Sequence, residues 1–234
     1  MARRRFFVDQ VHDGSAAISG DEAHHLVRVL RVEPGQKFEI SDAHTVWLAE
    51  VETARKGEVR FRVLEELPPA AQLPEIVLCL ALIKFDRFEW AVEKATELGA
   101  TRIVPVETAR TDKGLFEGAA KRVERWRRVA QEASEQSRRL APPRIMDPVK
   151  LTAVHAEAPA HRFVLDEQPG APLLIRLVTA APVAVFIGPE GGWTDTERAA
   201  LLSSGWVAGS LGRLILRAET AVCAALAVTG QVLQ

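Results

Sequence analysis

The spacing of apolar and polar residues changes partway along the chain. Residues 37–66 contain three short runs in which apolar and polar side chains alternate, most clearly in GEVRFRVLEE. Alternation at period two is typical of half-buried antiparallel strands, and short strands at this spacing predict a small β-barrel or sandwich. Ahead of them, Ser19 followed by Glu22 has a capping-box pattern and predicts a short helix through residues 24–30.

Beyond residue 74 the pattern becomes one of alternating strands and helices. The run IVLCLALI at 76–83 is uniformly apolar, as in a strand covered on both faces. Residues 85–98 place apolar side chains at helical spacing, and Gly99 predicts a left-handed end to that helix. This alternation predicts an α/β domain with a largely parallel sheet. Further strands are expected at 102–106, 162–166, 183–187 and 206–210, and a long polar helix at 117–139.

The segment LPPAAQLP (67–74) contains three prolines and separates the two patterns. Such segments are typical of domain boundaries, so we expect one domain over 1–72 and a second over 73–234. The last helix, ETAVCAALAVTGQVL, lacks a polar face. A helix of this kind is buried, and the sheet or a second subunit is expected to cover it.

Composition limits the class of protein. Of the 234 residues, 47% are hydrophobic and 26% charged, as in folded globular proteins. The net charge of −1 requires any nucleic-acid surface to be a local patch. Cys79 and Cys223 lie in apolar runs without metal-ligand spacing, which indicates reduced thiols in a cytoplasmic protein. We expect no membrane span, and no signal peptide in MARRRFFVDQ, which lacks an apolar core.

A glycine-rich turn follows the strand at 183–187, in VAVFIGPEGGWTDTE. Turns between a buried strand and a helix often bind nucleotides. A phosphate-binding P-loop requires a lysine after the last glycine, and a Rossmann turn requires GxGxxG at the first strand–helix turn. Neither is present, and Glu190 would repel a phosphate. The alternative is a tight loop whose glycines only permit positive φ, and spacing leaves both interpretations open.

A second glycine turn, GSLGRLILRAETA (209–221), follows the next expected strand. Two such loops at the carboxyl ends of strands lie at the edge where parallel sheets bind ligands. Their backbone amides and carbonyls suit a flat ligand that presents no phosphate, such as an adenosine.

The paired motifs IGPEGGW (187–193) and SLGRLILRAETA (210–221) resemble those of the SPOUT-class methyltransferases. The similarity is greatest to the RsmE family, which methylates N3 of a uridine in small-subunit (16S) ribosomal RNA. Other segments extend the resemblance over nearly the whole chain, the first two matching the family's PUA-like RNA-binding barrel: RRFFV (4–8), HHLVRVLRV (24–32), EKATELG (93–99) and EASEQSRR (132–139).

The resemblance implies a fold and a set of partners. It implies a C-terminal α/β domain with a trefoil knot, an exception to the rule against threaded chains, and a small N-terminal PUA-like β-barrel. It further implies S-adenosylmethionine as cofactor and a homodimer with the active site near the subunit interface. The substrate would be 16S rRNA within the small ribosomal subunit, methylated in the cytoplasm during ribosome biogenesis.

The resemblance also implies site residues. Arg217 is the first catalytic candidate, because an arginine near the uridine would stabilise negative charge on its carbonyl oxygens; the alternative is that it caps the preceding strand. Glu190 is the second candidate, as a base or, preferably, as a positioning group beside the cationic sulfonium. The cofactor-binding candidates are Leu165, Ile187, Gly188, Pro189, Glu190, Gly191, Gly192, Ser210, Leu211, Gly212, Leu214, Ile215, Leu216 and Thr220.

One position departs from the family. Its usual pattern is LGxRILRxETA, and here Leu214 occupies the place of the first arginine while Arg213 precedes it. This weakens the case for Arg213 as a functional residue. It also keeps open a non-catalytic RNA-binding or assembly factor, and a SPOUT enzyme for another RNA or base atom. The intact pair of glycine loops favours an enzyme.

The RNA-binding surface is expected to be local. Residues 110–144 contain ten Lys or Arg against five Asp or Glu, which favours phosphate contacts; the alternative is an ordinary solvated helix. His24 and His25 are adjacent without a third ligand, so no metal site is expected. The RNA-binding candidates are Arg3, Arg4, Arg5, His24, Arg28, Arg31, Gln136, Ser137, Arg138 and Arg139.

Overall fold

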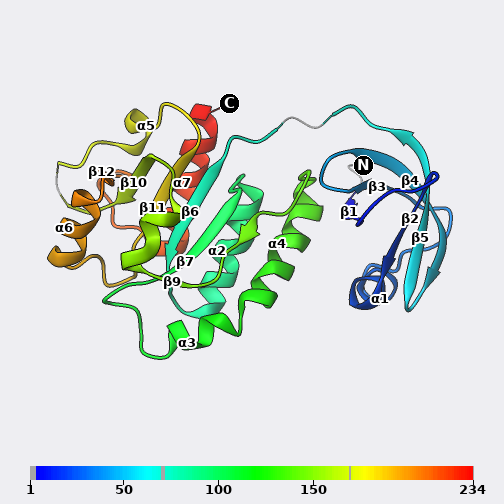
Figure 1. The fold of residues 1–234 in the computed structure, drawn as a ribbon, viewed down its shortest axis with the longest axis horizontal. Helices are drawn as coiled ribbons and strands as arrows, with labels where there is room; N and C mark the ends of the chain where they lie inside the picture. Colours follow the sequence, from blue (N-terminus) through cyan, green and yellow to red (C-terminus); the bar gives the residue numbers. More distant parts are fainter. Residues whose placement is uncertain (1–3, 70–71, 169, 234) are drawn as a thin grey trace. The chain divides into compact units, whose positions relative to one another are not determined.

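The chain forms two units in the computed structural model, which describes residues 4–69, 72–168 and 170–233 (Figure 1). Unit 1 comprises Met1–Gln72 together with Ser134–Pro142, and unit 2 comprises Leu73–Ala133 and Pro143–Gln234. The division between 72 and 73 falls within the proline-containing segment. Residues 134–142 return to unit 1, whereas the sequence predicted two contiguous domains.

Unit 1 contains a five-stranded sheet with the order β1-β3-β4-β5-β2. β1 pairs with β3 in parallel, and the other neighbours are antiparallel. The alternating pattern has the predicted effect, since Val59 and Phe61 are buried while Arg60 and Arg62 are exposed. The antiparallel strands are confirmed; a closed barrel stays a prediction. The elements are β1 (Arg5–Phe7), β2 (Ser15–Ser19), α1 (Gly20–Arg28), β3 (Lys37–Ser41), β4 (Val46–Arg55) and β5 (Glu58–Glu66).

The start of α1 differs from the prediction. The helix begins at Gly20, and the Ser19 side chain accepts no capping hydrogen bond in the described structure. Gly20 has a φ of +68°, a left-handed conformation that glycine adopts without a steric penalty. The chain therefore enters the helix through glycine geometry, and the capping box predicted at Ser19 was wrong.

An Arg–Glu–Arg cluster attaches residues 134–142 to the sheet of unit 1. Arg5 donates from Nε and Nη2 to Glu39 Oε2, at 3.1 and 2.8 Å. Its Nη1 donates to the carbonyls of Arg138 and Arg139, at 2.8 and 3.1 Å. Arg138 forms a second ion pair with Glu39. Because the Arg5 and Glu39 side chains are each only 7% exposed, each of these buried charges is compensated mainly by charged partners within the protein and little by water.

Unit 2 is built on a seven-stranded sheet with the main order β12-β10-β11-β6-β7-β8, and β9 pairs with β7. Every one of these pairings is parallel. All residues of β6 and β11 are buried, as the uniformly apolar runs predicted. The strands are β6 (Ile76–Ala81), β7 (Arg102–Glu107), β8 (Arg144–Ile145), β9 (Val149–Lys150), β10 (His161–Leu165), β11 (Val183–Ile187) and β12 (Val207–Gly209).

The helices of unit 2 follow the strands as expected, with one exception. Gly99 has a φ of +93° and the Ala100 amide donates to the Ala95 carbonyl at 3.0 Å, so the predicted left-handed helix end is confirmed. The single helix expected at 117–139 is instead two helices. The helices are α2 (Phe85–Glu97), α3 (Leu115–Ala120), α4 (Val123–Ser137), the 3₁₀ helix η1 (Leu151–Glu157), α5 (Leu174–Leu177), α6 (Asp195–Ser203) and α7 (Ala218–Leu233).

Close packing accompanies the break between α3 and α4. Gly118 lies inside α3, where a Cβ atom would be 3.0 Å from the Phe85 ring. A glycine allows this approach but weakens the helix. α4 ends where Arg138 adopts a φ of +58°. The charge pattern from which one long helix was predicted gives no sign of the break between α3 and α4 or of the end of α4 before Arg138.

The last helix, α7, packs against α2 and β11. Val222, Ala225 and Leu226 are fully buried there, while Ala227 and Val232 remain exposed. Burial of this helix is therefore confirmed for one face within the chain. The trefoil knot stays a prediction.

Candidate functional site

A cavity of about 390 Å³ opens at the carboxyl ends of β10, β11 and β12 in unit 2. This is the edge at which parallel sheets bind ligands. Its walls come from four segments: residues 165–167 at the end of β10, the first glycine loop (187–193), the second glycine loop (210–217) with the start of α7, and Arg87 of α2.

The first glycine loop is shaped by Trp193. This side chain is 5% exposed, contacts Phe186 edge to face at 4.8 Å, and donates from Nε1 to the Leu165 carbonyl at 2.8 Å. A Cβ atom at Gly188 would lie 2.8 Å from the indole. Gly188 is therefore required for the indole to lie directly against the backbone of the loop.

The other two glycines of this loop have separate constraints. Gly192 has a φ of +71°, and its amide closes a turn onto the Pro189 carbonyl at 2.9 Å. A Cβ atom at Gly191 would approach the Arg110 side chain to 3.0 Å, and Arg110 donates to the Gly191 carbonyl. The structural interpretation of these glycines is thus supported, and it coexists with their place beside the cavity.

A complete capping box fixes the helix that follows the first glycine loop. Thr194 accepts from the Glu197 amide at 3.2 Å, and Glu197 accepts from the Thr194 amide at 3.0 Å. Glu197 is 6% exposed and also accepts from the Ala109 amide at 2.7 Å. This carboxylate therefore joins the β7–α3 connection to the start of α6, directly after the first glycine loop.

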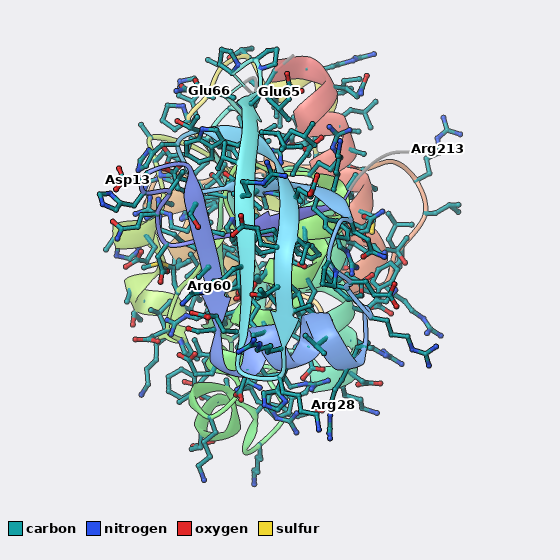
Figure 2. All side chains as sticks on the ribbon, turned by 90° about the vertical axis from the view of Figure 1, so that its right-hand side faces the viewer. Asp13, Arg28, Arg60, Glu65, Glu66 and Arg213 are labelled. Carbon is teal, nitrogen blue, oxygen red and sulfur yellow. The ribbon has the colours of Figure 1, made fainter. Side chains whose placement is uncertain are left out.

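The second glycine loop has few constraints of its own. Ser210 Oγ accepts from the Gly212 amide at 3.1 Å. Leu214 and Ile215 are 81% and 82% exposed. Arg213 extends from the loop into solvent (Figure 2), and it is absent from the cavity lining. Arg217 lines the cavity and is exposed.

Three carboxylates and two arginines supply the charge of the cavity lining. Asp166 is buried and paired with Arg198 at 2.5 Å, and this hydrogen bond raises the pKa of Arg198. Glu190 is paired with Arg87 of α2. Glu167 also lines the cavity and is exposed. Arg198 and Arg87 offset the charges of Asp166 and Glu190, so among the described lining residues Glu167 is the carboxylate placed to attract a cationic group.

Most of the candidates for cofactor binding line this cavity. Gly191 and Thr220 do not appear in the lining of the described residues, since Gly191 faces Arg110 and Thr220 is exposed on α7. The lining candidates are Leu165, Ile187, Gly188, Pro189, Glu190, Gly192, Ser210, Leu211, Gly212, Leu214, Ile215 and Leu216, joined by the catalytic candidate Arg217.

The lining also contains residues that the sequence analysis missed. Trp193 follows the predicted residue Gly192, and Asp166 follows the predicted residue Leu165, so extending each predicted segment by one position includes them. Arg87 lies 103 positions before its partner Glu190 and had no local signal. The missed lining residues are Arg87, Asp166, Glu167, Trp193, Ala218 and Ala221.

The N-terminal RNA-binding candidates differ in exposure. His24, Arg28 and Arg31 are exposed, Arg4 is half-buried, and Arg3 lies outside the described residues. Arg28 projects from α1 in Figure 2.

Two of the RNA-binding candidates are buried, since Arg5 and Arg139 are 6% and 8% exposed. Arg5 is bonded inside unit 1, and burial lowers the pKa of Arg139 to about 10. Neither guanidinium lies at the surface. Of the remaining candidates, Gln136 and Arg138 are exposed and Ser137 is half-buried, with Arg138 also paired to Glu39.

Two further features bear on the class of site. Within the part of the chain that the structure describes, His, Cys, Asp and Glu form no cluster able to hold a metal ion. None of the helices described is long and apolar enough to cross a membrane.

Known proteins match the chain over both units. An RNA methyltransferase domain model matches residues 71–230, and an RNA methyltransferase PUA domain model matches residues 18–64. Ribosomal RNA small subunit methyltransferase E of Mycobacterium tuberculosis is 34% identical, covering 98% of this chain and 92% of that protein.

Two solved structures also match along their full length. The same methyltransferase from Neisseria gonorrhoeae, bound to S-adenosylmethionine, has a TM-score of 0.87 at 27% identity and covers 99% of this chain and 98% of that one. A methyltransferase from Legionella pneumophila, in complex with the same cofactor, has a TM-score of 0.87 at 29% identity, and the match covers 98% of this chain and 97% of that one.

Proposed function

This chain belongs to the ribosomal RNA small subunit methyltransferase E family, and from that premise we propose that it methylates N3 of a uridine in 16S rRNA, using S-adenosylmethionine. The observation that carries the proposal is the cavity between two glycine loops at the carboxyl ends of β10, β11 and β12. The N3 atom and the uridine follow from the family resemblance of the paired motifs.

The lining of the cavity fits S-adenosylmethionine. Its volume of about 390 Å³ lies within the range of small-molecule sites. Leu165, Ile187 and Leu216 provide apolar surface for an adenine, and the glycine loops provide backbone amides and carbonyls. Glu167 supplies negative potential that favours a sulfonium or an ammonium, whereas the charge of Glu190 is offset by Arg87. When bound, the cofactor supplies an electrophilic methyl group.

Arg217 is the candidate for contact with the target base. It lines the cavity, and its exposed guanidinium is accessible to a nucleotide. A uridine N3 must lose its proton to attack a methyl group, and the negative charge then spreads over the carbonyl oxygens. An arginine beside them favours the deprotonated base. Glu190 is already paired with Arg87, which supports its positioning role over a role as base.

The two units divide the task in this proposal. Residues 1–72, joined by residues 134–142, form the RNA-binding domain, with His24, Arg28 and Arg31 as exposed candidates for rRNA contact, and the rest of residues 73–234 form the methyltransferase domain. Exposed Leu214 and Ile215, together with the exposed side of α7, suit a second copy of the chain close to the cavity. The homodimer, the small-subunit substrate and the cytoplasmic location are all part of the proposal.

A nucleoside assay tests the function directly. The protein is incubated with S-adenosylmethionine and either small ribosomal subunits or naked 16S rRNA, and the RNA is digested to nucleosides. We expect N3-methyluridine in at least one of the two reactions. Methyl on another atom would indicate a different base specificity, and no product together with no cofactor binding would indicate a non-catalytic RNA-binding factor.

Replacing Arg217 tests its role in that reaction. Removal of one charge-stabilising donor lowers kcat by about 10²–10³-fold in comparable sites, and we expect Arg217→Ala to do the same with little change in the cofactor Kd. The matched control is Arg213→Ala, which lies outside the cavity lining. An unchanged kcat for Arg217→Ala would remove this residue from the mechanism.

A further inference from the structure

Arg87 connects the two sides of the cavity from a third element. It lies in the first turn of α2, lines the cavity, and forms an ion pair from Nη1 to Oε1 of Glu190 in the first glycine loop. Its Nε is 4.0 Å from Oε1 of Glu219, in the first turn of α7 directly after the second glycine loop. One guanidinium thus faces a carboxylate from each side of the site.

We propose that Arg87 is a positioning residue that sets the separation of the two glycine loops around the cofactor. This inference rests on the proposed function, because it assigns Arg87 to the site at which S-adenosylmethionine binds. The carboxylates of Glu190 and Glu219 repel each other, and the guanidinium of Arg87 attracts both of them.

The chemistry of arginine suits this task. Its planar guanidinium presents five N–H donors in a fixed fork, so it is able to face two carboxylates at once, whereas a lysine ammonium is a single compact charge. Glu219 is 15% exposed in its side chain, and its Oε2 is buried without a hydrogen-bond partner in the described structure. The neighbouring guanidinium therefore lies where it compensates the charge of a carboxylate that is mostly shielded from solvent.

The backbone of Arg87 is held firmly. Phe88, Ala91 and Val92 of the same helix are fully buried, and α2 packs against α7. The second glycine loop lacks comparable anchoring, since Leu214 is 81% exposed. The α2 helix therefore provides a fixed reference point, and Arg87 ties to it the Glu190 side chain of the first loop and the Glu219 side chain that follows the second loop.

The test measures S-adenosylmethionine binding by isothermal titration calorimetry to the full-length protein. Coupled neighbouring residues show interaction effects well above measurement error, and we expect Arg87→Met to raise the cofactor Kd by about tenfold. Glu190→Gln should raise it too, and the double variant should raise it by less than the product of the two single effects. Arg87→Lys should fall between wild type and Arg87→Met.

The matched control removes another ion pair of α2. Arg125 of α4 donates from Nε to Glu89 of α2 at 2.8 Å, outside the cavity lining. Arg125→Met should leave the cofactor Kd within twofold of wild type. In a methylation assay, Arg87→Met should raise the cofactor KM while kcat at saturating cofactor falls by less than threefold.

Different outcomes separate the two proposals. If the wild-type chain does not bind the cofactor, the proposed function fails. If the wild type binds and Arg87→Met binds equally well, or the effects of Arg87→Met and Glu190→Gln simply multiply, the positioning role is overturned. Should Arg87→Met fail to fold, Arg87→Lys and Glu190→Gln, each singly and together, give the same test.

Discussion

The close contact between Gly188 and Trp193 predicts that the single methyl group added by Gly188→Ala destabilises the protein. In Gly188→Ala the new Cβ would lie 2.8 Å from indole Cε2 and 3.0 Å from Cζ2 and Nε1. The indole has little freedom to move, because it is 5% exposed and bonded to the Leu165 carbonyl. Inserting a methyl group into such packing costs about 1–3 kcal/mol.

The assay is thermal and urea unfolding of the full-length chain. For a protein of this size each kcal/mol lowers Tm by about 2–4 °C, so Gly188→Ala should lower Tm by about 2–12 °C. Gly57→Ala is the matched control, because no atom lies within 4 Å of its added Cβ. A substitution of that kind usually changes stability by less than about 0.5 kcal/mol.

A second substitution identifies the clash as the cause. Phenylalanine lacks the indole nitrogen that crowds Gly188, so Trp193→Phe should relieve part of the cost of Gly188→Ala. The two single changes should therefore be non-additive, with the double variant more stable than their sum predicts. A Gly188→Ala protein as stable as wild type would refute the reasoning, and so would strict additivity.

Two further predictions concern other parts of the molecule. Arg5→Met should lower the free energy of unfolding by about 3–5 kcal/mol, since it leaves buried Glu39 with less compensation. The matched variant Arg60→Met removes an exposed ion pair and should have a much smaller effect; similar losses for both variants in urea unfolding would contradict this. Burial raises the pKa of the Cys79 and Cys223 thiols and so lowers the fraction present as thiolate. After treatment with iodoacetamide at pH 8, mass spectrometry should find Cys79 unmodified and Cys223 modified slowly. Rapid labelling of Cys79 in the native protein would contradict its burial.

The sequence indicated those features that local patterns encode. Uniformly apolar runs gave the buried parallel strands, and alternation gave the antiparallel ones. The two glycine turns gave the place of the cavity, because carboxyl ends of parallel strands share one edge. Gly99 ended its helix as predicted, through a left-handed residue that other side chains rarely adopt.

Features that depend on distant contacts were not accessible in this way. Arg87 reaches the cavity only because α2 packs next to α7, and nothing in the neighbouring sequence distinguishes it from a surface arginine. The local sequence predicts a surface charge at Arg5, and its burial depends on Glu39 and on carbonyls more than 130 positions away. In both cases tertiary partners decide the role of an ordinary charged residue.

The return of residues 134–142 to unit 1 has a consequence for the order of synthesis. A fragment ending at Gln72 would lack the carbonyl acceptors of Arg5 and one of the two arginines that pair with Glu39. Ser41, which donates to the Leu140 carbonyl at 2.9 Å, would lose its acceptor as well. On a translating ribosome the first unit therefore completes its hydrogen bonding only after residue 142 has left the exit tunnel, when the first strands and helices of the second unit have already emerged.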